Sequence, residues 1–202
     1  VYKRQVFDSA RKAGDSAVVT SDSNCYVVVF RSVGRQEYAT KDVRHILFKV
    51  DESALDSEAE TYEADLQAAK DAAKTAAEDA LAQWKAGEAT EDSFAALANE
   101  LSADDGSNTN GGLYTKIYKN QMVTEFNDWC FDASRQSGDT GIVYGESSNY
   151  KGYHVMYFVG DDVPYWQVQA ENALRNTDTE AWLDGLLDSA EVVQENGMKH
   201  VG

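Results

Sequence analysis

The stretch that most constrains this chain runs from Leu101 to Leu113 and reads LSADDGSNTNGGL. It combines an apolar helix end, two adjacent carboxylates, a run of small polar residues and a Gly-Gly pair. Glycine permits backbone conformations that are closed to other residues, and Asn, Asp and Ser side chains bond their own backbone in turns. The stretch therefore predicts a shaped loop that leaves a helix. A plain surface loop can share this composition, so its importance depends on the residues that converge on it.

The composition indicates a folded protein with an acidic surface. Of the 202 residues, 43% are hydrophobic and 11% are aromatic, which is enough for one good core. The chain has 35 acidic and 18 basic residues, and its net charge is −17. Nucleic acids and anionic membranes attract clusters of Lys and Arg, and the sequence shows none. We therefore expect no nucleic-acid partner and a surface that is mostly solvated charge.

The sequence contains no motif for a metal, a cofactor or a membrane span. Cys25 and Cys130 lie far apart in apolar surroundings, so we expect buried free thiols rather than a disulfide. There is no Cys-x-x-Cys pair, no Cys/His metal spacing, no phosphate loop and no run of about 18 apolar residues. We expect no cofactor and no metal. The chain begins at Val1 in VYKRQ, which we interpret as a non-native start, so a membrane anchor would require a missing N-terminal segment.

An internal repeat indicates a duplicated structural unit. Two pairs of segments match: FDSARKAGDSAVV at 7–19 with FDASRQSGDTGIV at 131–143, and CYVVVF at 25–30 with GYHVMY at 152–157. In this alignment Val27 occupies the position of His154. The first copy therefore looks like the end of a degenerate module that lacks this histidine.

The remaining pattern predicts an α+β fold. Alternating β-formers and apolar spacings of three and four predict a strand, two helices, a strand, a helix and two strands, at 42–50, 57–86, 93–101, 113–118, 123–133, 141–144 and 153–159. Thr90 or Asp92 could cap the second helix. After Pro164 an amphipathic helix should run from Trp166 to Leu187, and its apolar side chains would need a docking surface.

These observations divide the chain into three parts. Residues 1–40 would be the tail of a preceding degenerate module, residues 41–160 the main domain, and residues 161–202 a C-terminal amphipathic helix and tail. The main domain would hold a small antiparallel sheet with helices around it.

Five motifs in this order resemble a parvulin-type peptidyl-prolyl isomerase domain, of the kind found in extracytoplasmic bacterial foldases such as PrsA and SurA. They are RHILFKV, an Ala-rich helix that ends in WKAGE, SFAALANELSADDGSNTNGGL, QMVTEF and GYHVMYF. The resemblance covers residues 42–160 and implies a parvulin-like four-stranded sheet. It also implies cis–trans isomerisation of X-Pro bonds in unfolded or exported proteins, and a location at the cell surface or in the periplasm.

The resemblance also assigns site residues. His45 and His154 match the two histidines that face each other across the family's active site, and Asp104 matches the central position, which is Cys in some parvulins. The apolar residues that receive the proline ring correspond to Leu113, Met122 and Phe126.

The chemistry of these residues is compatible with such a reaction. The chain has three histidines, and His200 lies close to the end, where an inert side chain is expected. His45 and His154 lie in β-type segments, where a buried imidazole needs a partner. Rotation about X-Pro has a barrier of about 18–20 kcal/mol, and lowering it by about 3–4 kcal/mol gives a common turnover rate. A shaped apolar pocket and a polar network could do this without a nucleophile, a metal or a cofactor.

The sequence departs from the family pattern near the site. Tyr114 follows Leu113 where a small residue is usual, and Tyr118 is our candidate for the aromatic residue of that strand. The loop from Gly145 to Lys151 is long, and Lys151 stands where a hydroxyl residue is common. The strand predicted at 42–50 is followed by Asp51 and Glu52 instead of a basic cluster. These acidic residues would repel a phosphate group, so we expect no selectivity for phosphorylated residues.

Two other functions remain open. The departures and the degenerate first copy are also compatible with a chaperone-like holdase that keeps the fold without catalysis. Two histidines and a carboxylate, here His45, His154 and Asp104, are chemically adequate for a divalent metal.

Overall fold

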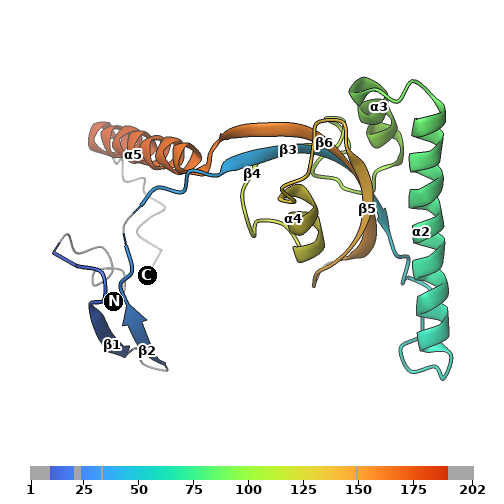
Figure 1. The fold of residues 1–202 in the computed structure, drawn as a ribbon, viewed down its shortest axis with the longest axis horizontal. Coiled ribbons are helices and arrows are strands. Elements are labelled where there is room, and N and C mark those ends of the chain that lie inside the picture. The colour runs from blue at the N-terminus through green and yellow to red at the C-terminus, as the bar shows by residue number, and fades with distance from the viewer. Residues whose placement is uncertain (1–9, 21–23, 33, 149, 191–202) are drawn as a thin grey trace, which may run out of the picture. The chain divides into compact units, whose positions relative to one another are not determined.

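The computed structural model describes residues 10–20, 24–32, 34–148 and 150–190, and the chain forms two compact units, Val1–Gln36 and Glu37–Gly202 (Figure 1). Three features singled out in the sequence, the VYKRQ start, the beginning of the first repeat at Phe7 and the third histidine, His200, lie outside the described residues.

The larger unit contains an antiparallel sheet of four strands in the order β4-β3-β6-β5. Its strands are β3 (Ala39–Lys49), β4 (Leu113–Ile117), β5 (Thr140–Glu146) and β6 (Lys151–Pro164). Its helices are α2 (Tyr62–Ala86), α3 (Glu91–Leu101), α4 (Thr124–Cys130) and α5 (Tyr165–Ser189). The predicted order of elements and the α+β class are confirmed.

Local sequence explains where the helices begin. Helix α3 starts with a reciprocal capping box: the Ser93 amide donates to Thr90 Oγ1 at 3.1 Å, and the Thr90 amide donates to Ser93 Oγ at 3.0 Å. Thr90, not Asp92, is therefore the cap. Helix α2 begins at Tyr62 rather than at residue 57, because Asp56 accepts the Glu58 amide at 3.0 Å and holds the intervening residues in turns.

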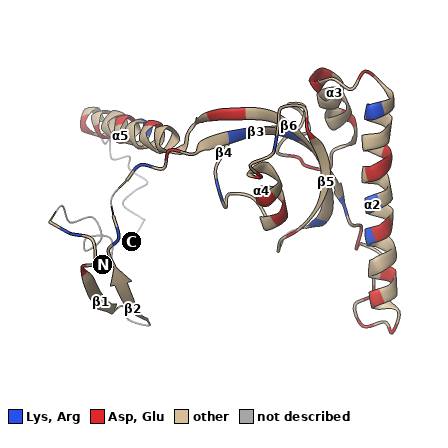
Figure 2. Ribbon diagram, in the orientation of Figure 1, with Lys and Arg blue, Asp and Glu red and all other residues tan. Residues whose placement is uncertain are grey.

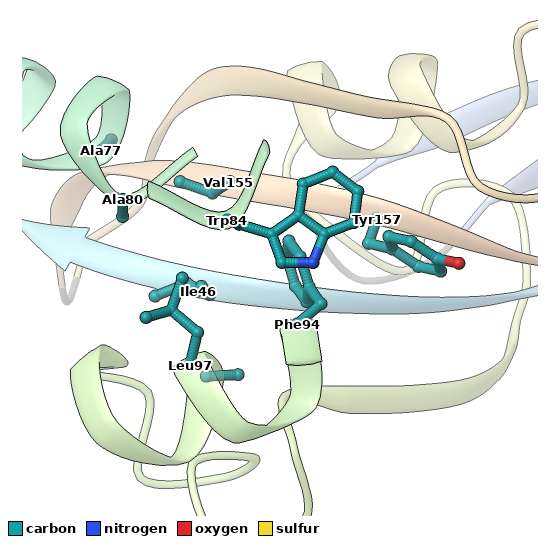
Figure 3. Packing of buried hydrophobic residues seen from close by; sticks show 9 residues of the cluster. Ile46, Ala77, Ala80, Trp84, Phe94, Leu97, Val155 and Tyr157 are labelled. Carbon is teal, nitrogen blue, oxygen red and sulfur yellow. The ribbon is translucent and has the colours of Figure 1, made fainter. Parts of the chain in front are cut away.

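The two faces of the sheet pack against different helices. The face toward α2 and α3 carries the larger core cluster (Figure 3), made by Ile46, Ala77, Ala80, Trp84, Phe94, Leu97, Ala98, Val155 and Tyr157. The face toward α4 carries a second cluster made by Val43, Ile117, Phe126, Cys130, Met156 and Phe158. Side chains alternate along a strand, so β3 sends Ile46 to the first face and His45 to the second.

The smaller unit contains a hairpin of β1 (Ser16–Thr20) and β2 (Cys25–Val29). Its turn repeats the turn before β5. The Gly14 amide donates to the Phe30 carbonyl at 2.9 Å, as the Gly138 amide does to the Phe158 carbonyl at 2.8 Å. Gly14 and Gly138 have φ values of +95° and +90°. The described parts of the two repeats therefore share one hairpin geometry.

This geometry corrects the sequence alignment of the repeats by one residue. Phe30 corresponds to Phe158, and the pairing of Val19 with Tyr26 corresponds to that of Val143 with His154. Tyr26, and not Val27, therefore stands at the position of His154. The loop between the strands differs in length, and apolar strand residues alone do not define the register across it.

Helix α5 is held at its N-terminal end. The Tyr165 ring stacks on Tyr38 and Tyr118, with centroids 5.4 and 4.8 Å apart, and Lys116 pairs with Glu171 at 3.1 Å. None of its residues is buried, and Trp182 is 63% exposed. Beyond these contacts, the described residues therefore do not cover the apolar side chains of the helix, although a docking surface was expected.

The two cysteines differ in burial. Cys130 is buried, and burial raises the pKa of its thiol to about 12. Cys25 is exposed, so the expectation of two buried thiols was wrong for Cys25. Acidic residues are spread over α2, α3, α4 and α5 (Figure 2). Among the described helices, none is long and apolar enough to cross a membrane.

Candidate active site

The two predicted histidines meet on the face of the sheet that α4 covers. In the register of β3 and β6, His45 lies opposite Met156 and His154 lies opposite Leu47, which makes the two histidines diagonal neighbours. Both are 3% exposed, and their Nδ1 atoms lie 3.0 Å apart. The strands therefore hold the imidazoles in direct hydrogen-bond contact.

The Leu101–Leu113 stretch is a loop, as predicted, and it is tied to β3 by backbone hydrogen bonds. The Ala103 amide donates to the Leu47 carbonyl at 2.9 Å, and the His45 amide donates to the Gly112 carbonyl at 2.9 Å. Gly112 has φ +69°, and a Cβ there would lie 2.2 Å from the His45 carbonyl oxygen. Only glycine fits this close approach, which explains half of the Gly-Gly pair.

Asp104 lies at the end of the histidine pair. Its Oδ2 accepts hydrogen bonds from His45 Nε2 at 2.9 Å, from the Ser107 hydroxyl at 2.5 Å and from the Tyr114 hydroxyl at 3.0 Å. The hydrogen bond from His45 is the main cause that holds the pKa of Asp104 far below its ordinary value, and burial opposes it. Asp104 is therefore an ionised carboxylate at neutral pH. Its neighbour Asp105 is exposed and does not line the cavity beside the two histidines.

His154 lies at the other end and is neutral. Burial lowers the pKa of its imidazole to about 3, with a smaller contribution from His45. Its Nε2 lies 3.0 Å from the Tyr150 hydroxyl. Burial also raises the pKa of Tyr150, which keeps the phenol protonated, and burial with the Asp104 contact raises the pKa of Tyr114 to about 12.

A cavity of about 360 Å³ opens above this row of polar groups. Its lining residues are His45, Leu47, Lys49, Asp104, Tyr114, Gln121, Met122, Val123, Phe126, Tyr150 and His154. A larger hollow of about 560 Å³ runs along α5, but the described residues that line it all belong to that exposed helix. The smaller cavity is the one with convergent polar groups and an apolar wall, as in a ligand site.

The structure brings five of the six sequence-predicted residues to this cavity, and Leu113 is not among its lining residues. Leu113 lies opposite Arg44 in β3, while Tyr114 lies opposite Val43. Because side chains alternate, Tyr114 faces the cavity in place of Leu113. Tyr118, the candidate for the aromatic residue, instead stacks on Tyr165.

Sequence reasoning missed three hydroxyl groups of the site. Ser107 is fully buried in the loop, Tyr114 had been noted only as a departure, and Tyr150 lies one residue before the strand. Lys151, noted as a substitute for a hydroxyl residue, pairs with Glu52 at 2.7 Å. The even spacing between Tyr150 and His154 was the sequence signal for one of the three hydroxyl groups.

The site has a polar floor built from side chains that hydrogen-bond one another. Its ring nitrogens and its carboxylate already hydrogen-bond one another, and among the described residues no group of three or more His, Cys, Asp or Glu side chains is arranged to hold a metal ion. The arrangement can hold an apolar ring against Met122, Val123 and Phe126, beside an ionised carboxylate.

A protein-family model now bears on this arrangement. The Rotamase model, described as the PPIC-type PPIASE domain, matches residues 45–160, more than half of the chain. This chain belongs to that family. The rotamase region begins at His45 and contains His154, Asp104 and the whole cavity lining.

Known structures resemble the chain at low identity. A peptidylprolyl isomerase, PrsA from Bacillus cereus, is 22% identical with a TM-score of 0.41, and the match covers 80% of this chain and 54% of that one. A Campylobacter jejuni structure from a study of PEB4 and the periplasmic protein Cj1289, two SurA-like chaperones, is 22% identical with a TM-score of 0.40, covering 78% and 56%. The chain thus spans about half the length of these structures. A search of curated proteins found no match.

Proposed function

We propose that this chain is a peptidyl-prolyl cis–trans isomerase that acts on X-Pro bonds of unfolded polypeptides without a covalent intermediate. The observation that carries the proposal is the row His154–His45–Asp104 at the floor of an apolar-walled cavity, within a rotamase domain.

In this proposal Met122 and Phe126 hold the proline ring, and Tyr114 takes the position expected for Leu113. Phe126 is 2% exposed and sets its ring edge-on to both histidines, with centroids 5.6 and 5.4 Å away. A rigid apolar wall at this distance would place the X-Pro amide next to the polar row.

The polar row would lower the rotation barrier electrostatically. Resonance places partial negative charge on the carbonyl oxygen of a planar amide, and rotation removes that resonance. An ionised Asp104 beside that oxygen would raise the energy of the planar amide more than that of the twisted one. A difference of about 3–4 kcal/mol would accelerate the reaction by two to three powers of ten.

We extend the proposal to the partner and the location. The partner would be an unfolded, proline-containing polypeptide, and the five motifs that resemble bacterial foldases favour a protein that works outside the cytoplasm. The net charge of −17 argues against a nucleic-acid partner.

The test is a proline-peptide isomerisation assay of the wild type and His154→Ala. We expect a rate above background for the wild type and its loss in the variant. Met156→Leu is the matched control, since Met156 lies on the same face of β6, is fully buried and does not line the cavity. No acceleration by folded wild-type protein would contradict the proposal.

The alternative is a holdase that keeps the rotamase fold without catalysis. The exposed apolar side chains of α5, with Leu174 at 66%, Trp182 at 63% and Leu187 at 72% exposure, favour it. Suppressed aggregation of an unfolded client, together with no isomerase rate, would establish this alternative.

A further inference from the structure

Four groups, Tyr150, His154, His45 and Asp104, form one continuous hydrogen-bonded row through the site. The row runs from the Tyr150 hydroxyl to His154 Nε2 at 3.0 Å, from His154 Nδ1 to His45 Nδ1 at 3.0 Å, and from His45 Nε2 to Asp104 Oδ2 at 2.9 Å. Tyr114 and Ser107 join at the Asp104 end. Each imidazole uses both of its nitrogens in the row, so the proton positions on the two rings depend on each other.

The Asp104 end determines the direction of the row. An ionised carboxylate can only accept, so His45 Nε2 must carry a hydrogen. In a neutral His45 the Nδ1 atom is then an acceptor, and the facing Nδ1 of His154 must donate to it. A neutral His154 that carries hydrogen on Nδ1 leaves Nε2 bare, so the Tyr150 hydroxyl must donate there.

A charged His45 would reverse the direction of the hydrogen bonds from His45 to His154 and from His154 to Tyr150. His45 Nδ1 would donate to His154, and His154 Nε2 would donate to the Tyr150 oxygen. The Tyr150 hydrogen would then need another acceptor, and among the described residues the structure gives this hydroxyl no other hydrogen bond. Within the described part of the chain, only the neutral arrangement pairs every hydrogen of the row, and leaving a part-buried donor unpaired is costly.

We propose that Tyr150 is a positioning residue that donates to His154 Nε2 and, with Asp104, selects one proton arrangement of the histidine pair. This inference rests on the proposed function, because it gives the row its catalytic meaning. Every hydrogen of the row then points toward Asp104, the one ionised group of the row.

The placement of Tyr150 follows from the strand. Tyr150 and His154 are four residues apart at even positions, so both face the α4 side, while Lys151 faces away and pairs with Glu52. The Tyr150 ring also packs edge-on against His154, with centroids 5.6 Å apart.

The test is the ring nitrogen NMR spectrum of the two histidines in the wild type, Tyr150→Phe and the control Tyr153→Phe. Tyr153 is a close neighbour on the opposite face of the strand and packs against Tyr144. We expect the wild type to carry its hydrogens on His154 Nδ1 and His45 Nε2. In Tyr150→Phe the bare Nε2 of His154 should shift downfield, and kcat/KM should fall about two- to tenfold, as for one lost hydrogen bond. Tyr153→Phe should leave both unchanged.

A hydrogen on His154 Nε2 in the wild type would overturn the inference. An Nε2 resonance that is the same in Tyr150→Phe and Tyr153→Phe would also overturn it. The spectrum needs no turnover, so an inactive protein with a Tyr150-dependent resonance would refute the proposed isomerase and keep the positioning role. If Tyr150→Phe fails to fold, the wild-type spectrum alone decides.

Discussion

The hairpins β1–β2 and β5–β6 share a turn, yet of their described residues only those near β6 contribute to the candidate site. In both, an aspartate and a glycine with positive φ close the turn onto a phenylalanine. In β5–β6, His154 is 3% exposed and reaches His45, whereas Tyr26 at the equivalent position of β2 is 42% exposed. A hairpin is thus encoded locally, but the site needs β3, α4 and the Leu101–Leu113 loop as well.

The largest expected effect comes from exchanging the residues that distinguish the two hairpins. His154→Tyr places the β2 residue in β6 and removes the central link of the row. We expect isomerase activity to fall by about 10²- to 10³-fold, the full acceleration required of the site. The measurement is the isomerisation rate, with circular dichroism to verify the fold.

The reverse exchange is the control. Tyr26→His in the His154→Tyr background should restore no activity, because no counterpart of His45 or Asp104 pairs with β2 in the described residues. Recovery of activity would mean that a hairpin with one histidine suffices without β3, α4 and the Leu101–Leu113 loop.

Glycines with positive φ should differ in the same way. An alanine at Gly112 meets the His45 carbonyl oxygen at 2.2 Å, whereas at Gly138 no heavy atom lies within 4 Å. Gly138→Ala should cost about 1–2 kcal/mol for the left-handed backbone alone. Gly112→Ala should cost about 2–4 kcal/mol, because overpacking adds to that strain. Equal losses in urea unfolding would contradict the close approach of the loop to β3.

Two equivalent valines test burial. Val155 in β6 is fully buried in the larger core, and its counterpart Val27 in β2 is 77% exposed. Val155→Ala should lower the free energy of unfolding by about 2–3 kcal/mol, since two methyl groups leave a packed site. Val27→Ala should change it by less than about 0.5 kcal/mol. A large effect at Val27 in denaturant unfolding would show that β2 is covered.

The pH dependence of stability should separate His154 from Tyr26. The pKa of His154 falls from its ordinary 6.5 to about 3 in the folded chain, so the unfolded chain takes up a proton first as the pH drops. Stability should therefore decrease below about pH 6.5, by about 2 kcal/mol at pH 5. Asp104, whose folded pKa is lowered, adds a loss only below about pH 4.

The measurement is urea unfolding at pH 7.5 and pH 5 for the wild type and His154→Tyr. The variant should lose most of the decrease between these two pH values, since tyrosine does not titrate there. An unchanged pH dependence in His154→Tyr would contradict a buried, neutral His154.

The fold was largely predictable because its signals are local. Neighbouring residues encode the strand at His45, the Ala-rich helix and the loop from Leu101. The order of these elements alone specifies the α+β class. The start of α2 was less predictable, since Asp56 stabilises turns where the composition also suits a helix.

The site was predictable in part, and the rest depended on register. His45, Asp104 and His154 followed from the family resemblance and meet in the structure. Tyr114 instead of Leu113 faces the cavity because of how β4 pairs with β3, which neighbouring residues do not encode. For the same reason, the sequence alignment of the repeats placed Val27 instead of Tyr26 at the position of His154.

If the row that ends at Asp104 accelerates X-Pro rotation, removing the Asp104 carboxylate should abolish the acceleration. The exchange rate between cis and trans forms of a proline peptide would be measured with the wild type, Asp104→Ala and Met156→Leu. We predict an accelerated rate with the wild type and with Met156→Leu, and a rate near background with Asp104→Ala. A background rate with folded wild-type protein, or full activity in Asp104→Ala, would show that this row does not catalyse X-Pro rotation.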